Sequence, residues 1–261
     1  MLDINIGDVT AAYEGAVGVI WEMLMGEQIH VGGEQETDIL AELAGVNAGT
    51  RVLDVLSGLG GPARHLARIY GATVTGLDAT GRMVNEAVLR TERAGLDDRV
   101  TFRSGNALDM PFKSGTFNIV WGQDSWCYVT DKDRLIRECR RVAAPGGTIA
   151  FTDWIETGPM SAKERRNLNA FMLFPYMGTL DGYRRLLRRH GFAVGVCEDL
   201  SEDFTVQMHR YRDALAGGLK GRIVELFGTE TFRDMERGIG LWVDAADEGK
   251  VGRGRCLGRK L

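Results

Sequence analysis

The stretch RVLDVLSGLGG, residues 51–61, decides the fold, because an apolar run meets a glycine-rich turn there. Residues 51–56 are rich in valine and leucine, which is typical of a buried β-strand. In the turn that follows, SGLGG, the backbone can approach a ligand closely, and residues 61–70 have the length of a helix. A strand, a glycine-rich turn and a helix in that order predict the first unit of a parallel α/β sheet.

The rest of the chain repeats the alternation of apolar runs and helix-length segments, which is the mark of a mostly parallel sheet with helices on both faces. Three more strands are predicted, at residues 73–78, 117–122 and 148–153, and further helices at 80–94 and 131–142. We find no internal repeat or low-complexity linker, so we expect a single domain over residues 1–261. Its expected parts are an N-terminal arm at 1–33, a ligand-binding core at 34–160, and lid segments with the last strands at 161–261.

Asp78 ends the second predicted strand, where a carboxylate can accept hydrogen bonds from two ribose hydroxyls. The competing interpretation is that Asp78 only caps the next helix. Neither G-x-G-x-x-G spacing nor a lysine follows the first turn, which disfavours a phosphate-binding loop. Together with the glycine turn, Asp78 predicts binding of a nucleoside.

Composition limits the class of protein and of partner. The 261 residues are 44% hydrophobic with a formal net charge of −4, which fits a globular enzyme and disfavours a nucleic-acid partner. No apolar run reaches the ~20 residues of a membrane span, and the first residues carry acids where a signal peptide has bases, so we expect a cytoplasmic protein.

The four cysteines lack C-x-x-C spacing, so we expect reduced thiols and no metal site. Arginines 184, 185, 188 and 189 predict a solvated helix face.

The segments VLDVLSGLGG, GLDAT, SGNALDMPF, FNIVWGQDSW and RVAAPGGTIAFTDW, within residues 52–154, resemble the class I S-adenosylmethionine-dependent methyltransferases. The resemblance implies a Rossmann-like seven-stranded sheet and S-adenosylmethionine as cofactor. Carried over residue by residue, it implies cofactor contacts at Asp54, Ser57, Gly58, Gly60, Asp78, Ala79, Asn106, Ala107 and Gln123. The sequence departs from the family pattern at Leu56, where a glycine is usual, and at Asn106, where an acid is usual.

A narrower resemblance links residues 26–32, 177–183 and 209–211 to the sarcosine/dimethylglycine N-methyltransferases and their tocopherol-methyltransferase relatives. It favours methylation of a small amine or amino acid. The alternative is a C- or O-methyltransferase of a phenol, quinone or prenyl compound, whose pocket residues 171–177 would line. The candidate catalytic or acceptor-orienting residues are His30, Gln123, Trp126, His209 and Tyr211.

Two other classes of protein share part of this sequence pattern. A nucleoside-binding protein without catalysis is suggested by Leu56, and a dinucleotide-dependent dehydrogenase shares the glycine turn and the ribose acid. The intact set of motifs, including the PGG at 145–147, disfavours both. We therefore expect a small-molecule methyltransferase, with a homodimer as a possible assembly.

Overall fold

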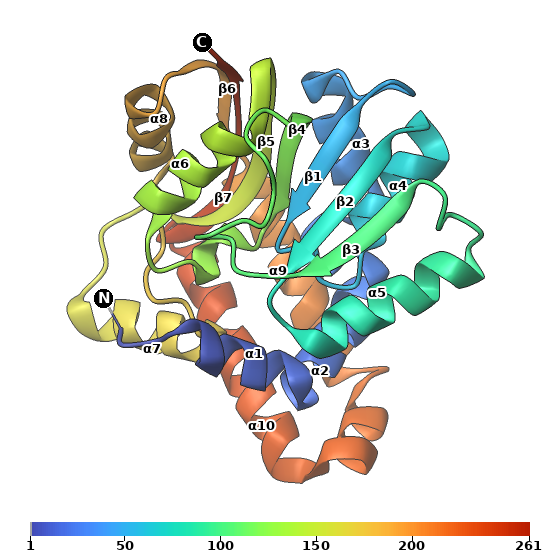
Figure 1. The fold of residues 1–261 in the computed structure, drawn as a ribbon. Helices are drawn as coiled ribbons and strands as arrows, with labels where there is room; N and C mark the ends of the chain where they lie inside the picture. Colours follow the sequence, from blue (N-terminus) through green and yellow to red (C-terminus); the bar gives the residue numbers. More distant parts are fainter. Residues whose placement is uncertain (1) are drawn as a thin grey trace.

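A computed structural model describes residues 2–261 of the chain (Figure 1). Its centre is a seven-stranded sheet in the order β3-β2-β1-β4-β5-β7-β6, in which β7 runs antiparallel to both neighbours and the other pairs are parallel. The strands are β1 (Arg51–Val55), β2 (Thr73–Asp78), β3 (Val100–Ser104), β4 (Phe117–Gln123), β5 (Ala143–Glu156), β6 (Phe192–Asp199) and β7 (Val251–Lys260). The predicted seven-stranded, mostly parallel α/β sheet is confirmed.

Helices cover both faces of this sheet, and neighbouring residues of β1 show which helices lie on which face. Val52 belongs to the same buried apolar cluster as Leu40 of α3 and Leu66 of α4. Leu53 points the other way and shares a cluster with side chains of α6 and α8. The helices of the sheet layers are α3 (Gly33–Ala44), α4 (Gly61–Tyr70), α5 (Gly81–Arg93), α6 (Lys132–Val142) and α8 (Leu180–Arg189).

The remaining helices gather beyond the carboxyl ends of β1, β2 and β4, on one side of the sheet (Figure 1). They contribute a third buried cluster that contains Trp21, Trp154 and Trp242. Within the lid segments expected at 161–261, two successive helices are separated by a turn at Gly217–Gly218. The helices of this layer are α1 (Ile6–Glu14), α2 (Ala16–Met25), α7 (Ala162–Met172), α9 (Ser201–Ala216) and α10 (Lys220–Asp247).

The strand β7 has an unusual sequence, VGRGRCLGRK, in which glycine and arginine alternate. Its glycine face is crowded: a Cβ on Gly252 would lie 1.8 Å from Ser201 Oγ, and one on Gly254 would lie 2.8 Å from Leu180 Cδ1. The opposite face places Arg253 and Arg255 against α3, where both are buried. Since alternating glycine and arginine is not a pattern of strand formers, the sequence analysis did not locate this strand.

The expectation that all four cysteines are reduced is wrong for two of them in this structure. Cys197 of β6 and Cys256 of β7 are direct partners in the antiparallel register, and a disulfide joins them. Cys127 and Cys139 are free and buried, as expected. The pairing follows from strand register, which the spacing of cysteines along the chain does not reveal.

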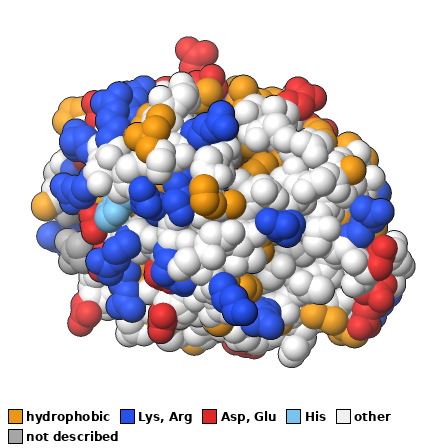
Figure 2. Space-filling view, turned by 45° about the horizontal axis from the view of Figure 1, so that its top comes forward, with side chains coloured by type: hydrophobic (Ala, Val, Ile, Leu, Met, Phe, Trp, Pro, Cys, Tyr) orange, Lys and Arg blue, Asp and Glu red, His pale blue; other side chains and the backbone are white. Residues whose placement is uncertain are grey.

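The arginine-rich helix face predicted at residues 184–189 lies on α8, where Arg185, Arg188 and Arg189 are exposed. Lys and Arg side chains gather at that side of the molecule in Figure 2. Arg189 lies 3.0 Å from Asp133, and Arg184 pairs with Asp181. Within residues 2–261, no helix combines the length and the apolar character needed to cross a membrane.

Candidate active site

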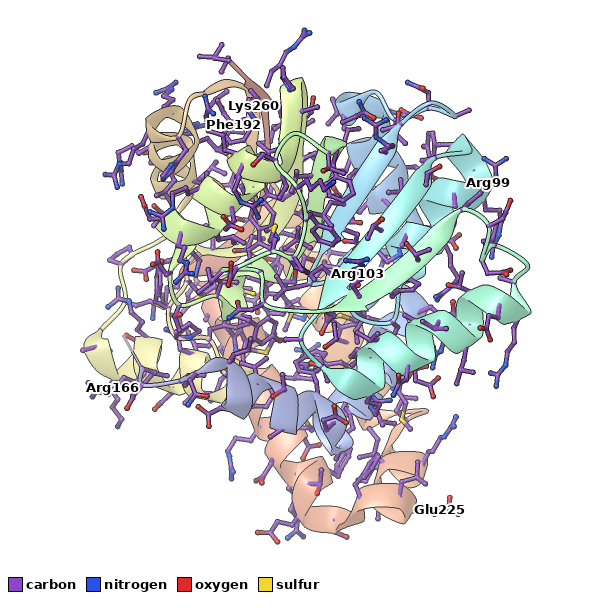
Figure 3. The ribbon with its side chains drawn as sticks, viewed as in Figure 1. Arg99, Arg103, Arg166, Phe192, Glu225 and Lys260 are labelled. Carbon is purple, nitrogen blue, oxygen red and sulfur yellow. A yellow bond between two sulfur atoms is a disulfide. The ribbon has the colours of Figure 1, made fainter. Side chains whose placement is uncertain are left out.

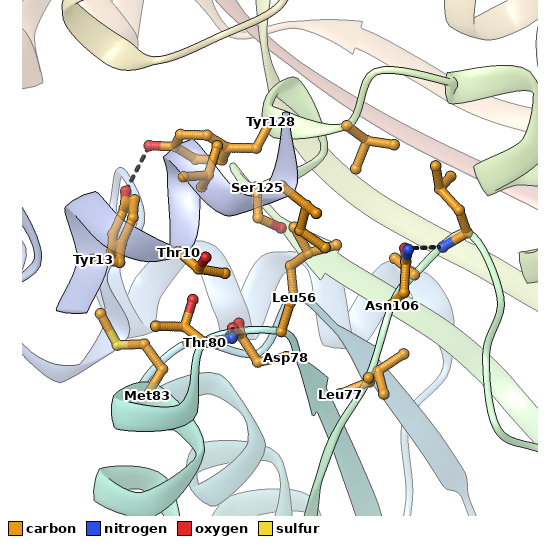
Figure 4. A pocket seen from close by; sticks show the side chains of 18 of the residues that line it. Thr10, Tyr13, Leu56, Leu77, Asp78, Thr80, Met83, Asn106, Ser125 and Tyr128 are labelled. Carbon is orange, nitrogen blue, oxygen red and sulfur yellow. Dashed lines mark hydrogen bonds between the residues drawn. The ribbon is translucent and has the colours of Figure 1, made fainter. Parts of the chain in front are cut away.

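A cavity of about 300 Å³ lies at the carboxyl ends of β1, β2 and β4, under the helix α1 (Figure 4). In parallel α/β sheets this edge is where ligands bind, because the loops after neighbouring strands converge there. One face of α1 forms the roof, with Ile6, Val9 and Tyr13 among the lining residues. The walls and floor of the cavity include Leu56, Gly58, Asp78, Ala79, Asn106, Ala107, Gln123, Asp124, Ser125 and Tyr128.

Asp78 is held by the backbone on either side of it. One carboxylate oxygen accepts from the Gly58 N–H at 2.9 Å, and the other accepts from the Thr80 N–H at 2.9 Å. Burial raises the pKa of Asp78, and these backbone hydrogen bonds oppose the rise. Each carboxylate oxygen retains a lone pair, so Asp78 can still accept from two ligand hydroxyls. Asp78 does not cap the helix α5, whose N-cap is Thr80, so its carboxylate stays available to a ligand.

The glycine-rich turn keeps its shape despite Leu56. Leu56 adopts a φ of 61°, which is the left-handed conformation that a glycine would adopt there, and its side chain lines the cavity (Figure 4). This conformation costs a leucine about 1–2 kcal/mol. The Leu56 and Ser57 N–H groups donate to the carbonyl of Leu77, at 2.7 and 3.1 Å, which holds the turn in place. The departure from the family pattern thus changes the cavity wall and leaves the loop path intact.

Six of the nine predicted cofactor residues line the cavity: Gly58, Asp78, Ala79, Asn106, Ala107 and Gln123. The other three lie behind its wall. Gly60 has a φ of 72° and allows Phe102 to pass within 2.4 Å of where a Cβ would be, and Ser57 and Asp54 are buried under the turn. The direct cofactor contacts assigned to these three residues are therefore not supported by their positions. Their supporting role is to shape the turn.

Gln123 lies in the cavity wall with its side-chain amide buried. Its side-chain oxygen accepts from Trp121 Nε1 at 3.0 Å and from Thr37 Oγ1 at 3.1 Å. Its side-chain nitrogen has no hydrogen-bond partner among the described residues, which is costly for a buried amide donor. Asp78 therefore fits the two ribose hydroxyls of a ligand such as S-adenosylmethionine, and Gln123 can meet its anionic end only if the amide turns toward the cavity.

Two tyrosines separate this cavity from a smaller one. The second cavity has a volume of about 20 Å³ and is lined by Tyr13, Trp21, Met25, Ile29, His30, Asp124, Tyr128, Trp154 and Met172. The hydroxyls of Tyr13 and Tyr128 are hydrogen-bonded at 2.5 Å, and both residues line both cavities (Figure 4). Burial raises the pKa of each above the usual range of tyrosine, so both hydroxyls are neutral. The sequence analysis missed Tyr13 because nothing in the expected N-terminal arm places it over the sheet.

The short helix η2 (Trp126–Tyr128) is fixed from below by buried polar groups. The Cys127 N–H donates to Asp153 at 2.9 Å, and Tyr183 donates to the other oxygen of that carboxylate. Lys132 donates to the carbonyl of Val129 at 3.1 Å. These contacts hold Tyr128 at the boundary between the cavities.

Of the acceptor-side residues predicted from sequence, His30 lies in the wall of the smaller cavity. Burial lowers the pKa of His30 to about 4, so the imidazole is neutral near pH 7. Its Nδ1 lies 3.0 Å from the carbonyl of Val31, and its Nε2 lies 3.1 Å from Thr37 Oγ1. Because both ring nitrogens have partners, His30 is better placed to orient neighbours than to take a proton.

The other predicted acceptor residues lie elsewhere. Trp126 is fully buried and stacks on Phe151, with ring centroids 4.2 Å apart, so it belongs to the core under the sheet edge. His209 is partly exposed on α9 and pairs with Asp247 at 2.8 Å, outside both cavities. Tyr211 is buried in the apolar cluster of the helical layer. Direct acceptor contacts by these three are not supported, because none of them lines either cavity.

The buried carboxyl group of Asp54 is expected to make the free energy of unfolding depend on pH. Burial, with a smaller contribution from the charge of Asp78, raises the pKa of Asp54 to about 7. Between about pH 4 and pH 7 the folded state therefore keeps on Asp54 a proton that the unfolded state has lost. The free energy of unfolding falls as the pH rises through this range. Asp54→Asn removes this loss. Relative to the wild type, the variant should be more stable at pH 8 by about 2–4 kcal/mol and nearly unchanged at pH 4, as measured by urea unfolding. An equal difference at both pH values would contradict the assignment.

Comparisons with known proteins agree with this geometry. A family model described as "Methyltransferase domain" matches residues 53–151. The chain is 31% identical, over 80% of its own length and 75% of the relative's, to a sarcosine/dimethylglycine N-methyltransferase of Halorhodospira halochloris. It is 30% identical, over 87% of its length, to a glycine/sarcosine/dimethylglycine N-methyltransferase of Actinopolyspora halophila, of which it spans 40%. Relatives of comparable similarity include sterol 24-C-methyltransferases and the 27-O-demethylrifamycin SV methyltransferase.

Among solved structures, the fold matches a Galdieria sulphuraria protein described as a "putative sarcosine dimethylglycine methyltransferase". The TM-score is 0.86 and the sequence identity 22%, and the match covers 93% of this chain and 96% of the other. That likeness concerns the fold. Taken with the sequence relatives, it shows that the chain belongs to the S-adenosylmethionine-dependent methyltransferases. The expected cofactor and class of enzyme are confirmed, whereas the relatives named above methylate nitrogen, carbon and oxygen.

Proposed function

We propose that the protein transfers a methyl group from S-adenosylmethionine to the nitrogen of a small amine or amino acid of sarcosine or dimethylglycine size. The observation that carries the proposal is the wall of the smaller cavity, in which aromatic side chains stand beside one carboxyl group, that of Asp124. Aromatic faces and a carboxylate stabilise an amine that becomes cationic as the new N–C bond forms. His30 is neutral near pH 7, and Asp124 supplies the carboxyl group of that wall.

The residues of the chain contribute mainly binding and alignment. Asp78 and Gln123 would hold the ribose and the anionic end of the cofactor, which supplies an electrophilic methyl group on its sulfonium. The acceptor nitrogen gives its lone pair to that methyl carbon while the S–C bond breaks, and such an in-line displacement depends on orientation. Tyr13 and Tyr128 lie where the methyl must pass, so their hydroxyls are placed to orient the acceptor nitrogen. Closure by α1 and the aromatic walls would exclude water.

An arginine clamp for an acceptor carboxylate has little support. Arg165 is paired with Glu156, and Arg166 is exposed on α7 and points away from the sheet edge (Figure 3). Arg210 and Arg212 are exposed on α9, and Arg212 pairs with Asp213. No arginine lines either cavity among the described residues. The amine end of the acceptor is therefore better supported than a carboxylate end.

A second candidate is C- or O-methylation of an apolar acceptor. Met25, Ile29 and Met172 lie in the wall of the smaller cavity, next to the apolar cluster that contains Phe174 and Met177. Methionine side chains adapt to bulky ligands, so this wall could open toward the cluster. A phenol or prenyl compound would fit such an enlarged pocket.

The test is a methyl-transfer screen with matched acceptors, preceded by calorimetry with S-adenosylhomocysteine to show that the cofactor site is intact. Dimethylglycine is compared with N,N-dimethylethanolamine, which has the same amine without the carboxylate, and with phenols and prenylated compounds. Turnover of either amine supports the proposal, and the ratio of the two shows whether a carboxylate is recognised. Turnover of phenols or prenyl compounds alone would replace it with the second candidate.

We also propose that the acceptor is free in solution and is not a nucleic acid, since the net charge is −4. A cytoplasmic location and a homodimer rest on the sequence alone and are proposals of the same kind. Size-exclusion chromatography with light scattering tests the dimer directly.

A further inference from the structure

A row of charged side chains of alternating sign leads from the smaller cavity, proposed above to bind the methyl acceptor, to the surface. Asp124 pairs with Arg253, Arg253 lies next to Glu36, and Glu36 pairs with Arg255. The row ends at Glu198, which is 48% exposed and lies 2.7 Å from Arg255. It joins the loop after β4 to β7, to α3 and to the edge strand β6. Charges buried this deeply are costly unless each is paired, so the row fixes the positions of its members.

Asp124 forms the end of the row at the cavity, and each of its two carboxylate oxygens accepts a hydrogen bond. One oxygen accepts from Arg253 Nε at 2.8 Å, and the other accepts from the Val31 N–H at 2.8 Å. Its backbone has a φ of 53°, a conformation that a non-glycine residue adopts only when its surroundings impose it. Asp124 lines both cavities. Its carboxylate therefore connects the acceptor wall, the turn at His30–Val31 and β7.

Arg253 is the residue that imposes this arrangement. It is fully buried, donates from Nη2 to Thr152 Oγ1 at 3.1 Å, and places Nη1 3.2 Å from Glu36 Oε2. Thr152 in turn accepts the Asp124 backbone N–H with its carbonyl at 2.8 Å. Arg253 therefore fixes both the side chain of Asp124 and the strand residue that holds its backbone. It touches neither cavity.

Glu36 lies on the other side of the Arg253 guanidinium as an ion pair at 3.2 Å, in which Arg253 Nη1 makes no hydrogen bond. Both its oxygens accept from Arg255, at 2.9 and 2.8 Å. Gly32 lets Glu36 and Arg253 come together, because a Cβ at Gly32 would lie 2.9 Å from Glu36 Cβ and 3.7 Å from Arg253 Nη1. The row holds three carboxylates, Asp124, Glu36 and Glu198, against two guanidiniums, so one negative charge remains in excess.

We propose that Arg253, held by Glu36, is a positioning residue for the acceptor: it sets the Asp124 carboxylate and the His30–Val31 turn that together form one wall of the acceptor cavity. The choice of an amine rests on the proposed function above, whereas the role of Arg253 does not.

The experiment compares Arg253→Ala, Arg253→Lys and Glu36→Gln with Arg259→Met, a control at an exposed position on the same strand. Each full-length protein is tested for thermal unfolding, for S-adenosylhomocysteine affinity, and for KM and kcat with whichever acceptor the wild type methylates. We expect Arg253→Ala to lower kcat/KM for the acceptor by about 10- to 100-fold, mostly through KM, with much less change in cofactor affinity. Arg253→Lys and Glu36→Gln should have smaller effects of the same sign, and the control none.

Added guanidinium at millimolar concentration should partly restore KM in Arg253→Ala, since it can occupy the vacated site, and should not affect the control. If Arg253→Ala does not fold, the two conservative variants carry the test. Unchanged acceptor KM in these folded variants would overturn the proposal, as would equal losses of acceptor and cofactor binding. If the wild type methylates only a neutral phenol, the proposed function fails, while the positioning role is still decided by the shift in KM for that phenol.

Discussion

Replacing Asp78 with alanine is expected to weaken binding of S-adenosylhomocysteine by at least about 100-fold, since hydrogen bonds to a charged group contribute about 1.5–3 kcal/mol each and two ribose hydroxyls would lose theirs. The variant also leaves the Gly58 and Thr80 N–H groups without the carboxylate to which they donate hydrogen bonds. The glycine-rich turn that forms part of the cavity wall is then held less firmly. Isothermal titration calorimetry measures the effect.

The control for this prediction is Asp97→Ala, an exposed acid of the same type. It should leave the affinity unchanged. Thermal unfolding of both variants shows whether the fold is retained, which we expect because burial without a counter-charge already disfavours the ionised Asp78. Wild-type affinity in Asp78→Ala would remove the ribose assignment.

Replacing Tyr128 with phenylalanine is expected to lower kcat by about 10- to 100-fold while the affinity for S-adenosylhomocysteine changes little. The substitution keeps the ring and removes the hydroxyl that bonds to Tyr13 at 2.5 Å. It leaves Tyr13 without its partner in a buried position, at a cost of about 1–3 kcal/mol, and removes a group placed at the passage between the cavities. Single-turnover kinetics with a saturating acceptor measures the methyl-transfer step directly.

Tyr70→Phe is the matched control, because Tyr70 bonds to Asp38 at 2.9 Å and lies outside both cavities. Its turnover should equal that of the wild type. Tyr13→Phe should resemble Tyr128→Phe, since each removes half of the same pair. If both tyrosine variants turn over at the wild-type rate, the passage between the cavities does not depend on this hydrogen bond.

The segment from β1 to β2 could be predicted residue by residue, whereas the strand β3 was not located. The strand at 73–78 and the helix at 61–70 have the predicted bounds, and β1 ends one residue earlier than predicted. In this region the local signals agree with the tertiary fold: apolar strand formers, glycines at turns and an acid at the strand tip. The acid at the strand tip pointed to Asp78 and the family resemblance to Asn106 and Gln123, and all three lie in the cavity wall.

Prediction failed where a residue's role depends on what packs against it. Trp126 and Tyr128 are two positions apart in η2, yet the tryptophan is buried on Phe151 and the tyrosine faces the cavities. The family-like surroundings drew attention to Trp126, whereas the turn of the helix selects Tyr128. Tyr13 could not be found at all from the sequence, since its partner is 115 residues away.

The sequence by itself determined the α/β class, the glycine turn and the acid at the tip of β2, because these follow from short-range patterns of side-chain polarity and backbone freedom, and its motifs resembled the family that the relatives show. Only the tertiary structure decided that β7 is a strand, that Cys197 and Cys256 meet, and that Arg253 lies buried beside Asp124 and Glu36. The physical reason is the same in each case. A buried arginine or a paired cysteine depends on partners supplied by distant segments, and only the folded chain brings them together.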